Sequence, residues 1–290
     1  MRIINSVLIF YWEVLKESIS GFFDEDMLTH AAALSYYMVF SLPSMLLIVL
    51  WTAAQFYSEA SVHSAIFSEI GMLVGEPGAQ QLMATLERLN IKEPTWWATA
   101  IGLAVLLFFA TTVFDALRTA LNRINQVKHS RSITKDIWLL FRIRFIAFGL
   151  LVSVSFILLV SLVLDAMVTA TGHYLAEWIG GLATYILSLD ALFVDLLTTA
   201  LLFMLYFRYL PDTRLKWSDA WFGALLTAGM LTVGKYLIGL YIGNSEVADL
   251  YDAAGSILVI MLWVYYAMAI FLFGATFTFT RARLLNKKRK

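Results

Sequence analysis

Residues 254–280 read AGSILVIMLWVYYAMAIFLFGATFTFT and contain no charged side chain. The residues that follow, RARLLNKKRK at 281–290, are mostly basic. About 20 apolar residues are enough for a helix to cross a membrane, and basic residues at the end of such a helix are retained on the cytoplasmic side. This part of the chain therefore predicts a transmembrane helix that ends at the cytoplasmic face.

The same pattern recurs along the chain. Besides 254–280, five segments have the length and apolar character of a span, at about 31–54, 96–116, 145–165, 187–207 and 218–241. Eighteen lysines and arginines lie in the two termini and in every second connection, whereas the other connections hold only Arg88 and Lys92. The bias predicts that both termini are cytoplasmic. We expect an all-α polytopic membrane protein: a single six-helix transmembrane domain at 27–283 and a basic cytoplasmic tail at 284–290.

The composition agrees with this class. The chain has 290 residues, of which 60% are hydrophobic and 14% are charged, whereas soluble domains have about 45–50% apolar and about 25% charged residues. It contains no cysteine, which excludes disulfides, thiolate metal sites and cysteine nucleophiles.

Two regions outside the spans have amphipathic patterns. In residues 1–26, apolar side chains recur at spacings of three and four, which predicts an interfacial helix on the cytoplasmic leaflet; they are Ile4, Leu8, Tyr11, Leu15, Ile19 and Phe22. Because Glu13, Lys16 and Glu17 interrupt the apolar run, we expect no cleaved signal peptide. The first outer loop, 58–95, predicts two short amphipathic helices that rest on the outer surface, and a lid over a central cavity would have the same pattern.

Lys235 is a charged residue within a predicted span, where insertion costs about 2.5–3.5 kcal/mol unless the side chain is paired or faces a cavity. By helical rise, Asp195 and Lys235 both lie roughly 9–12 Å below the outer end of their spans and could pair. We hypothesise a polar cavity near the outer leaflet, lined by Asp195, Lys235, Thr198, Thr199, Asp190, Asp165 and Asp252. Alternatively, Lys235 snorkels to the outer interface, while Asp190 and Asp195 belong to an outer helix end.

Two further features concern the spans and the largest cytoplasmic loop. Pro43 lies near the middle of the first span and predicts a kink. The loop at 118–144 is strongly basic, and we expect it to contact anionic phospholipid headgroups rather than nucleic acid, because no aromatic-interleaved basic surface accompanies it. The residues expected to make these contacts are Arg118, Arg123, Lys128, Arg131, Lys135, Arg142 and Arg144.

Three stretches together resemble the YihY/BrkB family: HAAALSYYMVFSLPSMLLIVL at 30–50, RYLPDTRLKWSDAWFGALLTAGMLTVGKYLIGLYIG at 208–243 and YDAAGSILVIMLWVYYAMAIFLFGA at 251–275. The resemblance implies a bacterial inner-membrane protein. Members have carried ribonuclease and virulence labels, and a role in the envelope or in lipid transport has been suggested. This chain departs from the family pattern at Thr276, where many members have glutamate, and at Asp252, where they have a small residue.

An enzymatic activity finds little support in the residues. The four histidines, His30, His63, His129 and His173, fall in different segments without the spacing of a metal site, which argues against a metal-dependent ribonuclease. Motifs for ATP, dinucleotide or serine-esterase chemistry are also missing from the sequence. We therefore expect no cofactor, and favour a transporter or lipid-handling protein over a non-catalytic scaffold for envelope assembly. A second copy of the chain or an envelope protein is left open as a partner.

Overall fold

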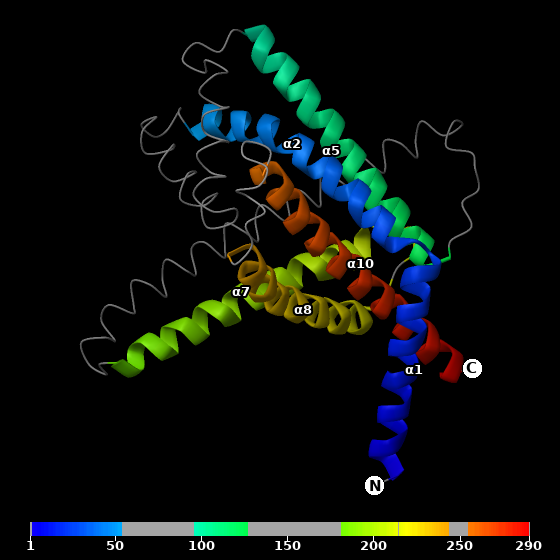
Figure 1. The fold of residues 1–290 in the computed structure, drawn as a ribbon. Helices are drawn as coiled ribbons and strands as arrows, with labels where there is room; N and C mark the ends of the chain where they lie inside the picture. Colours follow the sequence, from blue (N-terminus) through cyan, green and yellow to red (C-terminus); the bar gives the residue numbers. More distant parts are fainter. Residues whose placement is uncertain (1, 54–95, 127–180, 214, 244–254, 290) are drawn as a thin grey trace. The chain divides into compact units, whose positions relative to one another are not determined.

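Helices make up all the regular secondary structure in the part of the chain that is described. A computed structural model describes residues 2–53, 96–126, 181–213, 215–243 and 255–289. Its helices are α1 (Arg2–Asp24), α2 (Met27–Ala53), α5 (Trp96–Ile124), α7 (Gly181–Tyr209), α8 (Trp217–Gly243) and α10 (Gly255–Arg289) (Figure 1). The predicted all-α class is confirmed.

The chain divides into two compact units. The first contains Met1–Met27, Arg118–Val233 and Ile270–Lys290, and the second contains Leu28–Leu117 and Gly234–Ala269. The helix packing and the polar cluster described below belong to the first unit.

Five of the predicted spans fall within described helices. Helix α5 begins at Trp96, as expected, but continues beyond the predicted end at 116 to Ile124. Helix α10 continues to Arg289, so the predicted basic tail at 284–290 is helical almost to its end. The predicted span at 145–165 and the outer loop at 58–95 lie outside the described residues.

By length and apolar composition alone, one described segment could cross a membrane, Ile260–Lys288 in α10. A single segment of this kind is also found in the cores of soluble proteins. The length and composition of this one segment therefore do not by themselves assign the chain to a membrane.

Helix α1 forms as predicted, but its buried face differs from the predicted apolar stripe. Phe10, Val14, Ser18 and Phe22 are buried at a spacing of four residues. Phe10 and Val14 pack in one cluster with two residues of α10, Phe277 and Leu284. Leu8 and Ile19 of the predicted stripe are exposed, whereas Tyr11, Leu15 and Phe22 of that stripe are buried or half-buried. Periodicity shows which residues share a face but not which face a neighbouring helix covers. The predicted contact of this helix with the cytoplasmic leaflet stays a prediction.

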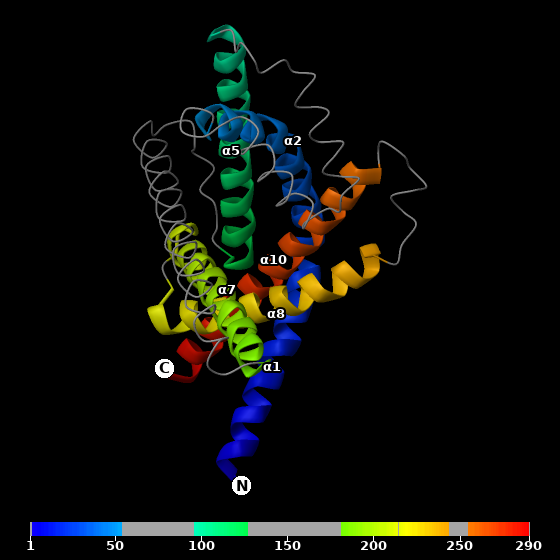
Figure 2. The same ribbon diagram turned by 90° about the vertical axis from the view of Figure 1, so that its left-hand side faces the viewer.

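Helices α8 and α10 cross one another (Figure 2), and two glycines lie where they pack together. A Cβ added to Gly223 of α8 would lie 2.6 Å from Cγ2 of Thr278, and one added to Gly274 of α10 would lie 2.7 Å from Cγ2 of Thr227. Each threonine thus occupies the space above the glycine of the other helix. We call these four residues the Gly–Thr crossing. Because glycine lacks a side chain, the two backbones can approach closely enough for this packing.

Candidate functional site

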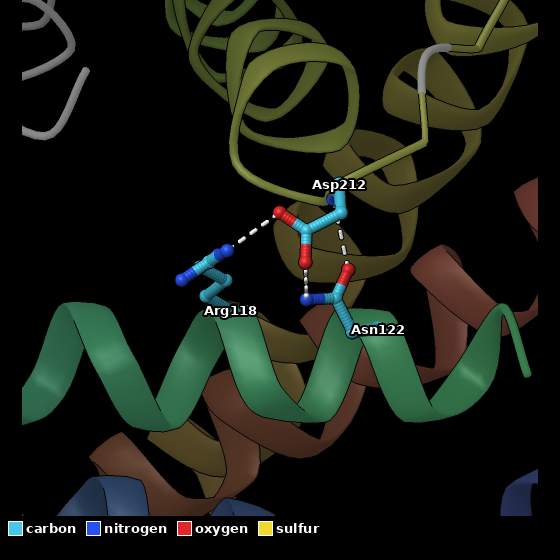
Figure 3. Close-up of polar contacts among 3 residues, drawn as sticks. All are labelled: Arg118, Asn122 and Asp212. Atoms are coloured by element: carbon cyan, nitrogen blue, oxygen red, sulfur yellow. Dashed lines mark hydrogen bonds and ion pairs between the residues drawn. The ribbon is translucent and has the colours of Figure 1, made fainter. Parts of the chain in front are cut away.

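The connection between α7 and α8 is bound to α5 through Asp212. Its Oδ1 accepts a hydrogen bond from Arg118 Nη2 at 2.6 Å, and its Oδ2 accepts one from Asn122 Nδ2 at 2.7 Å. The backbone N–H of Asp212 donates to Asn122 Oδ1 at 2.8 Å. Figure 3 shows the two side chains of α5 reaching the same carboxylate. We call Arg118, Asn122 and Asp212 the Asp212 clamp.

The spacing of residues on α5 explains how the clamp forms. Arg118 and Asn122 are four residues apart, so they lie on one face of α5, and Asn125 follows three residues later in the turn just beyond the helix end. Asn125 donates to the hydroxyl of Thr213, one residue beyond Asp212. Pro211 directly precedes this pair, and proline cannot continue the hydrogen bonding of α7. After α7 ends, the polar side chains of Asp212 and Thr213 can therefore form hydrogen bonds with residues at the C-terminal end of α5.

Asn122 is fully buried, with an exposed fraction of 0%. A buried amide costs free energy unless its donor and acceptor are both used, and here each is bonded to Asp212. The exposed fractions of the Arg118 and Asp212 side chains are 17% and 41%, so this ion pair is partly shielded from solvent. A charge-assisted bond at this burial is stronger than one at an open surface. The clamp is therefore a specific attachment between two segments that lie about 90 residues apart.

A second ion pair joins the start of α8 to α10. Arg281 Nη1 lies 2.6 Å from Asp219 Oδ1, with only 16% and 9% of the two side chains exposed. The guanidinium of Arg281 also stacks on the ring of Phe222, 4.3 Å from its centroid. Asp219 lies in the first turn of α8, where the helix dipole stabilises a negative charge.

Two more basic residues complete the cluster. Arg123 Nε lies 2.9 Å from Glu25 Oε2, at the corner between α1 and α2. Arg208, at the end of α7, stacks on Trp217 at 4.2 Å and donates to the carbonyl of Leu215. The contacts together link the C-terminal ends of α5, α7 and α10 to the start of α8 and to the end of α1.

The predicted cavity residues are only partly described. Asp195 is exposed on α7 within the first unit, with Thr198 and Thr199 half-buried beyond it. Lys235 is exposed on α8 but belongs to the second unit, so its pairing with Asp195 stays a prediction. Asp190 lies in the described backbone of α7, whereas Asp165 and Asp252 lie outside the described residues.

Among the predicted lipid contacts, Arg118 and Arg123 both have carboxylate partners. Arg118 is mostly buried and serves the clamp, whereas about half of the Arg123 side chain is exposed, 49%. The remaining predicted contacts, Lys128, Arg131, Lys135, Arg142 and Arg144, lie outside the described residues. Pro43 lies inside α2, which is assigned as one continuous helix, and the kink stays a prediction. Within the described ranges, no group of three or more metal-ligating side chains is found.

Comparison with known proteins decides the family. The family model described as virulence factor BrkB matches residues 18–290. The chain belongs to this BrkB family. The resemblance seen in the three sequence stretches is therefore confirmed.

The relatives to which this chain is similar are named as membrane proteins. A UPF0761 membrane protein of Idiomarina loihiensis is 28% identical over 62% of this chain and 60% of its own length. One of Delftia acidovorans is 24% identical over 93% of this chain and 62% of its own length. This chain thus spans about three fifths of the length of these two relatives. No solved structure matches it. With its family and composition, the chain is a membrane protein.

Proposed function

We propose that this BrkB-family chain is a multi-pass protein of the bacterial inner membrane that works as a transporter or lipid-handling protein. In this proposal the chain crosses the membrane six times with both termini in the cytoplasm. Asp195 and Lys235 supply charge to a polar cavity near the outer leaflet. The observation that carries the proposal is that both charged residues are exposed on long apolar helices.

The clustered helix ends support the topology. The excess of basic residues assigns the connection at 208–217, the loop that begins at 118 and the C-terminus to the cytoplasmic side. Contacts within the first unit bring these same segments together: Arg118 contacts Asp212, and Arg281 contacts Asp219. Segments that touch belong to one side of the membrane. Charge distribution and contacts thus point to the same arrangement.

The neighbours of Asp195 support a polar environment for it. Phe193 and Leu197, two residues away on either side, are also exposed. In an α-helix, residues two apart lie on nearly opposite faces. Phe193 and Leu197 can therefore face lipid on one side of α7, while Asp195 lies on the opposite side. An ionised carboxylate cannot face lipid without a large desolvation cost. The same pattern surrounds Lys235, with Val233 and Leu237 exposed.

The test uses the absence of native cysteine. Single cysteines at 195 and 235 are treated with a membrane-impermeant maleimide from each side of sealed vesicles. Cysteines at 197 and 237 are the controls, because they lie on the same helices but replace exposed apolar residues. The proposal expects labelling at 195 and 235 that exceeds the controls and shifts with an imposed ion gradient or added lipid.

The outcomes separate the two function classes. A transporter requires water access at 195 or 235, and the side of access changes during transport. If both cysteines are as unreactive as the controls from either side, the charges lie in a packed interior. That result would contradict the cavity and favour the scaffold for envelope assembly, for which we also expect Lys235→Met to be functionally silent.

A further inference from the structure

Helix α1 presents three distinct faces. One is buried against the rest of the first unit through Phe10, Val14, Ser18 and Phe22. The second, the outer face, is exposed and mostly apolar, and it consists of Leu8, Ile9, Trp12, Lys16, Ile19 and Phe23. The third, the acidic face, is exposed and consists of Glu13, Glu17, Ser20 and Asp24. At about 100° per residue, the outer and acidic faces are adjacent sectors that do not overlap.

The rotation of α1 is fixed by its contacts. At one end of the helix the Phe22 and Phe273 rings meet edge to face, 5.6 Å apart. Near the middle of α1, Lys288 Nζ lies 4.4 Å from the centroid of the Phe10 ring. These contacts hold the part of α1 from Phe10 to Phe22 antiparallel to the last part of α10. The outer face therefore cannot turn inward without breaking the buried cluster.

The outer face is unusually apolar for an exposed surface. Trp12 is 70% exposed, and Leu8, Ile9 and Phe23 are exposed to similar extents. Contiguous large apolar side chains of this kind indicate contact with a membrane or a partner. Tryptophan favours the boundary between headgroups and acyl chains, so Trp12 favours contact with a membrane over contact with a partner protein.

We propose that the outer face of α1 lies on the membrane surface and that Lys16 binds the phosphate of anionic phospholipids there. Lys16 is the one cation of this face, and its apolar stem can lie along neighbouring side chains while its ammonium group reaches a phosphate. The acidic face then points to water, where its carboxylates stay solvated and away from anionic lipid. Lys288 near the end of α10 lies beside Phe10, and Lys288 and its neighbour Lys287 are both exposed, so they add positive charge near the middle of α1.

This surface differs from the stripe that periodicity alone predicted. Tyr11, Leu15 and Phe22 of that stripe are buried or half-buried, whereas Ile9, Trp12 and Phe23 take their place on the outer face. The proposed surface is also independent of the cavity at Asp195 and Lys235, because it requires only that the protein be in a membrane.

The first experiment maps the faces of α1. Single cysteines at 12, 19 and 23 on the outer face, and at 13, 17 and 20 on the acidic face, carry the fluorophore NBD in the full-length protein. The protein is reconstituted in phosphatidylcholine vesicles with phosphatidylglycerol. Positions 19 and 20 form a matched pair, adjacent in sequence but on different faces. We expect nitroxide-labelled lipid to quench the outer-face probes and aqueous iodide to quench the acidic-face probes.

Two results would overturn the proposal. One is iodide quenching at 12, 19 and 23 as strong as at 13, 17 and 20, which would mean that the outer face lies in water. The other is that lipid fails to quench the outer-face probes until the protein is diluted to one copy per vesicle, which would mean that a second copy of the chain covers this face.

A second experiment tests the role of Lys16. The probe at position 19, one turn away, reports quenching by nitroxide-labelled phosphatidylglycerol relative to labelled phosphatidylcholine. Because one lysine near an anionic surface contributes an attraction that corresponds to about fivefold in binding, Lys16→Gln should lower this preference by up to about fivefold. Glu17→Gln, which changes one charge on the acidic face, is the control and should not lower it. An unchanged preference in Lys16→Gln would contradict the headgroup contact.

Discussion

The first unit joins its helices in two contrasting ways. At the Gly–Thr crossing, α8 and α10 meet through glycines and threonines without a charged group, and each threonine hydroxyl bonds within its own helix: Thr227 donates to the Gly223 carbonyl at 2.7 Å, and Thr278 to the Gly274 carbonyl at 2.6 Å. At the Asp212 clamp, α5 and the α7–α8 connection meet almost entirely through polar atoms.

The contrast shows what each kind of contact controls. At the four residues of the crossing, the hydroxyls are already satisfied within their own helices, so packing rather than hydrogen bonding determines how closely the backbones approach there. The Asp219–Arg281 ion pair between the same helices lies about one turn away. At the clamp, shape matters less than whether each donor faces an acceptor, because Asn122 is fully buried. The crossing should therefore be sensitive to added volume, and the clamp to exchanged donors and acceptors.

Added volume at the crossing should have the largest effect. Gly223→Ala places a Cβ within 2.6–2.7 Å of Thr278 carbon atoms, so α8 and α10 must separate. We expect the variant to lose about 3 kcal/mol of stability, at the upper end of the usual cost of overpacking. Thermal unfolding in detergent, followed by size-exclusion chromatography of the heated sample, measures the loss.

The same helix offers a matched control. At Gly229 of α8, no atom of the described residues, apart from the backbone of its own helix, lies within 4 Å of the position of an added Cβ. Gly229→Ala should be neutral or stabilising by up to about 1 kcal/mol, because alanine favours a helix over glycine. Equal destabilisation by both substitutions would show that steric contact at the crossing is not the cause. Thr278→Gly combined with Gly223→Ala should recover part of the loss.

Exchange of a donor for an acceptor should break the clamp. Asn122→Asp preserves shape but replaces the Nδ2 donor with an oxygen that faces the Asp212 carboxylate, 2.7 Å from the original nitrogen. We expect a loss of about 2 kcal/mol, comparable to leaving one buried polar group unsatisfied. Chemical denaturation of the purified protein measures it.

A reciprocal exchange tests the direction of the bond. Asp212→Asn in the Asn122→Asp background restores one donor and one acceptor between the two side chains, while its amide oxygen can still accept from Arg118. A double-mutant cycle should therefore show a coupling of about 1 kcal/mol or more. Additive losses from the two substitutions would contradict the clamp geometry.

The sequence predicted those features that depend on long apolar runs. The all-α class was predicted correctly because the apolar runs are long and mostly free of charge, and the family was predicted correctly from the three stretches at 30–50, 208–243 and 251–275. The end of α5 was missed: the sequence placed it at 116, but the helix continues to Ile124. Arg118 and Arg123 mark the basic edge of a span, yet a helix can continue past that edge where its polar side chains find partners.

The clamp was not predicted because its signal joins distant residues. Arg118, Asn122 and Asn125 have the spacing of one helix face, and Pro211 predicts a break before Asp212. Neither pattern identifies the other as its partner, since the two lie about 90 residues apart. Asn122 in particular could have been taken for a solvated residue near a helix end. Its burial depends on tertiary packing that periodicity does not encode.

The smallest effect should come from the exposed ion pair between Arg123 and Glu25. The N–O distance is 2.9 Å, but 49% and 31% of the two side chains are exposed, whereas Asn122 of the clamp is fully buried. Solvent and salt screen such a pair, so Arg123→Gln should cost about 0.5 kcal/mol or less in chemical denaturation. The loss should shrink further in high salt. A loss as large as that of Asn122→Asp would mean that burial does not separate the two contacts, and that the end of α1 is held to α5 as firmly as the α7–α8 connection is.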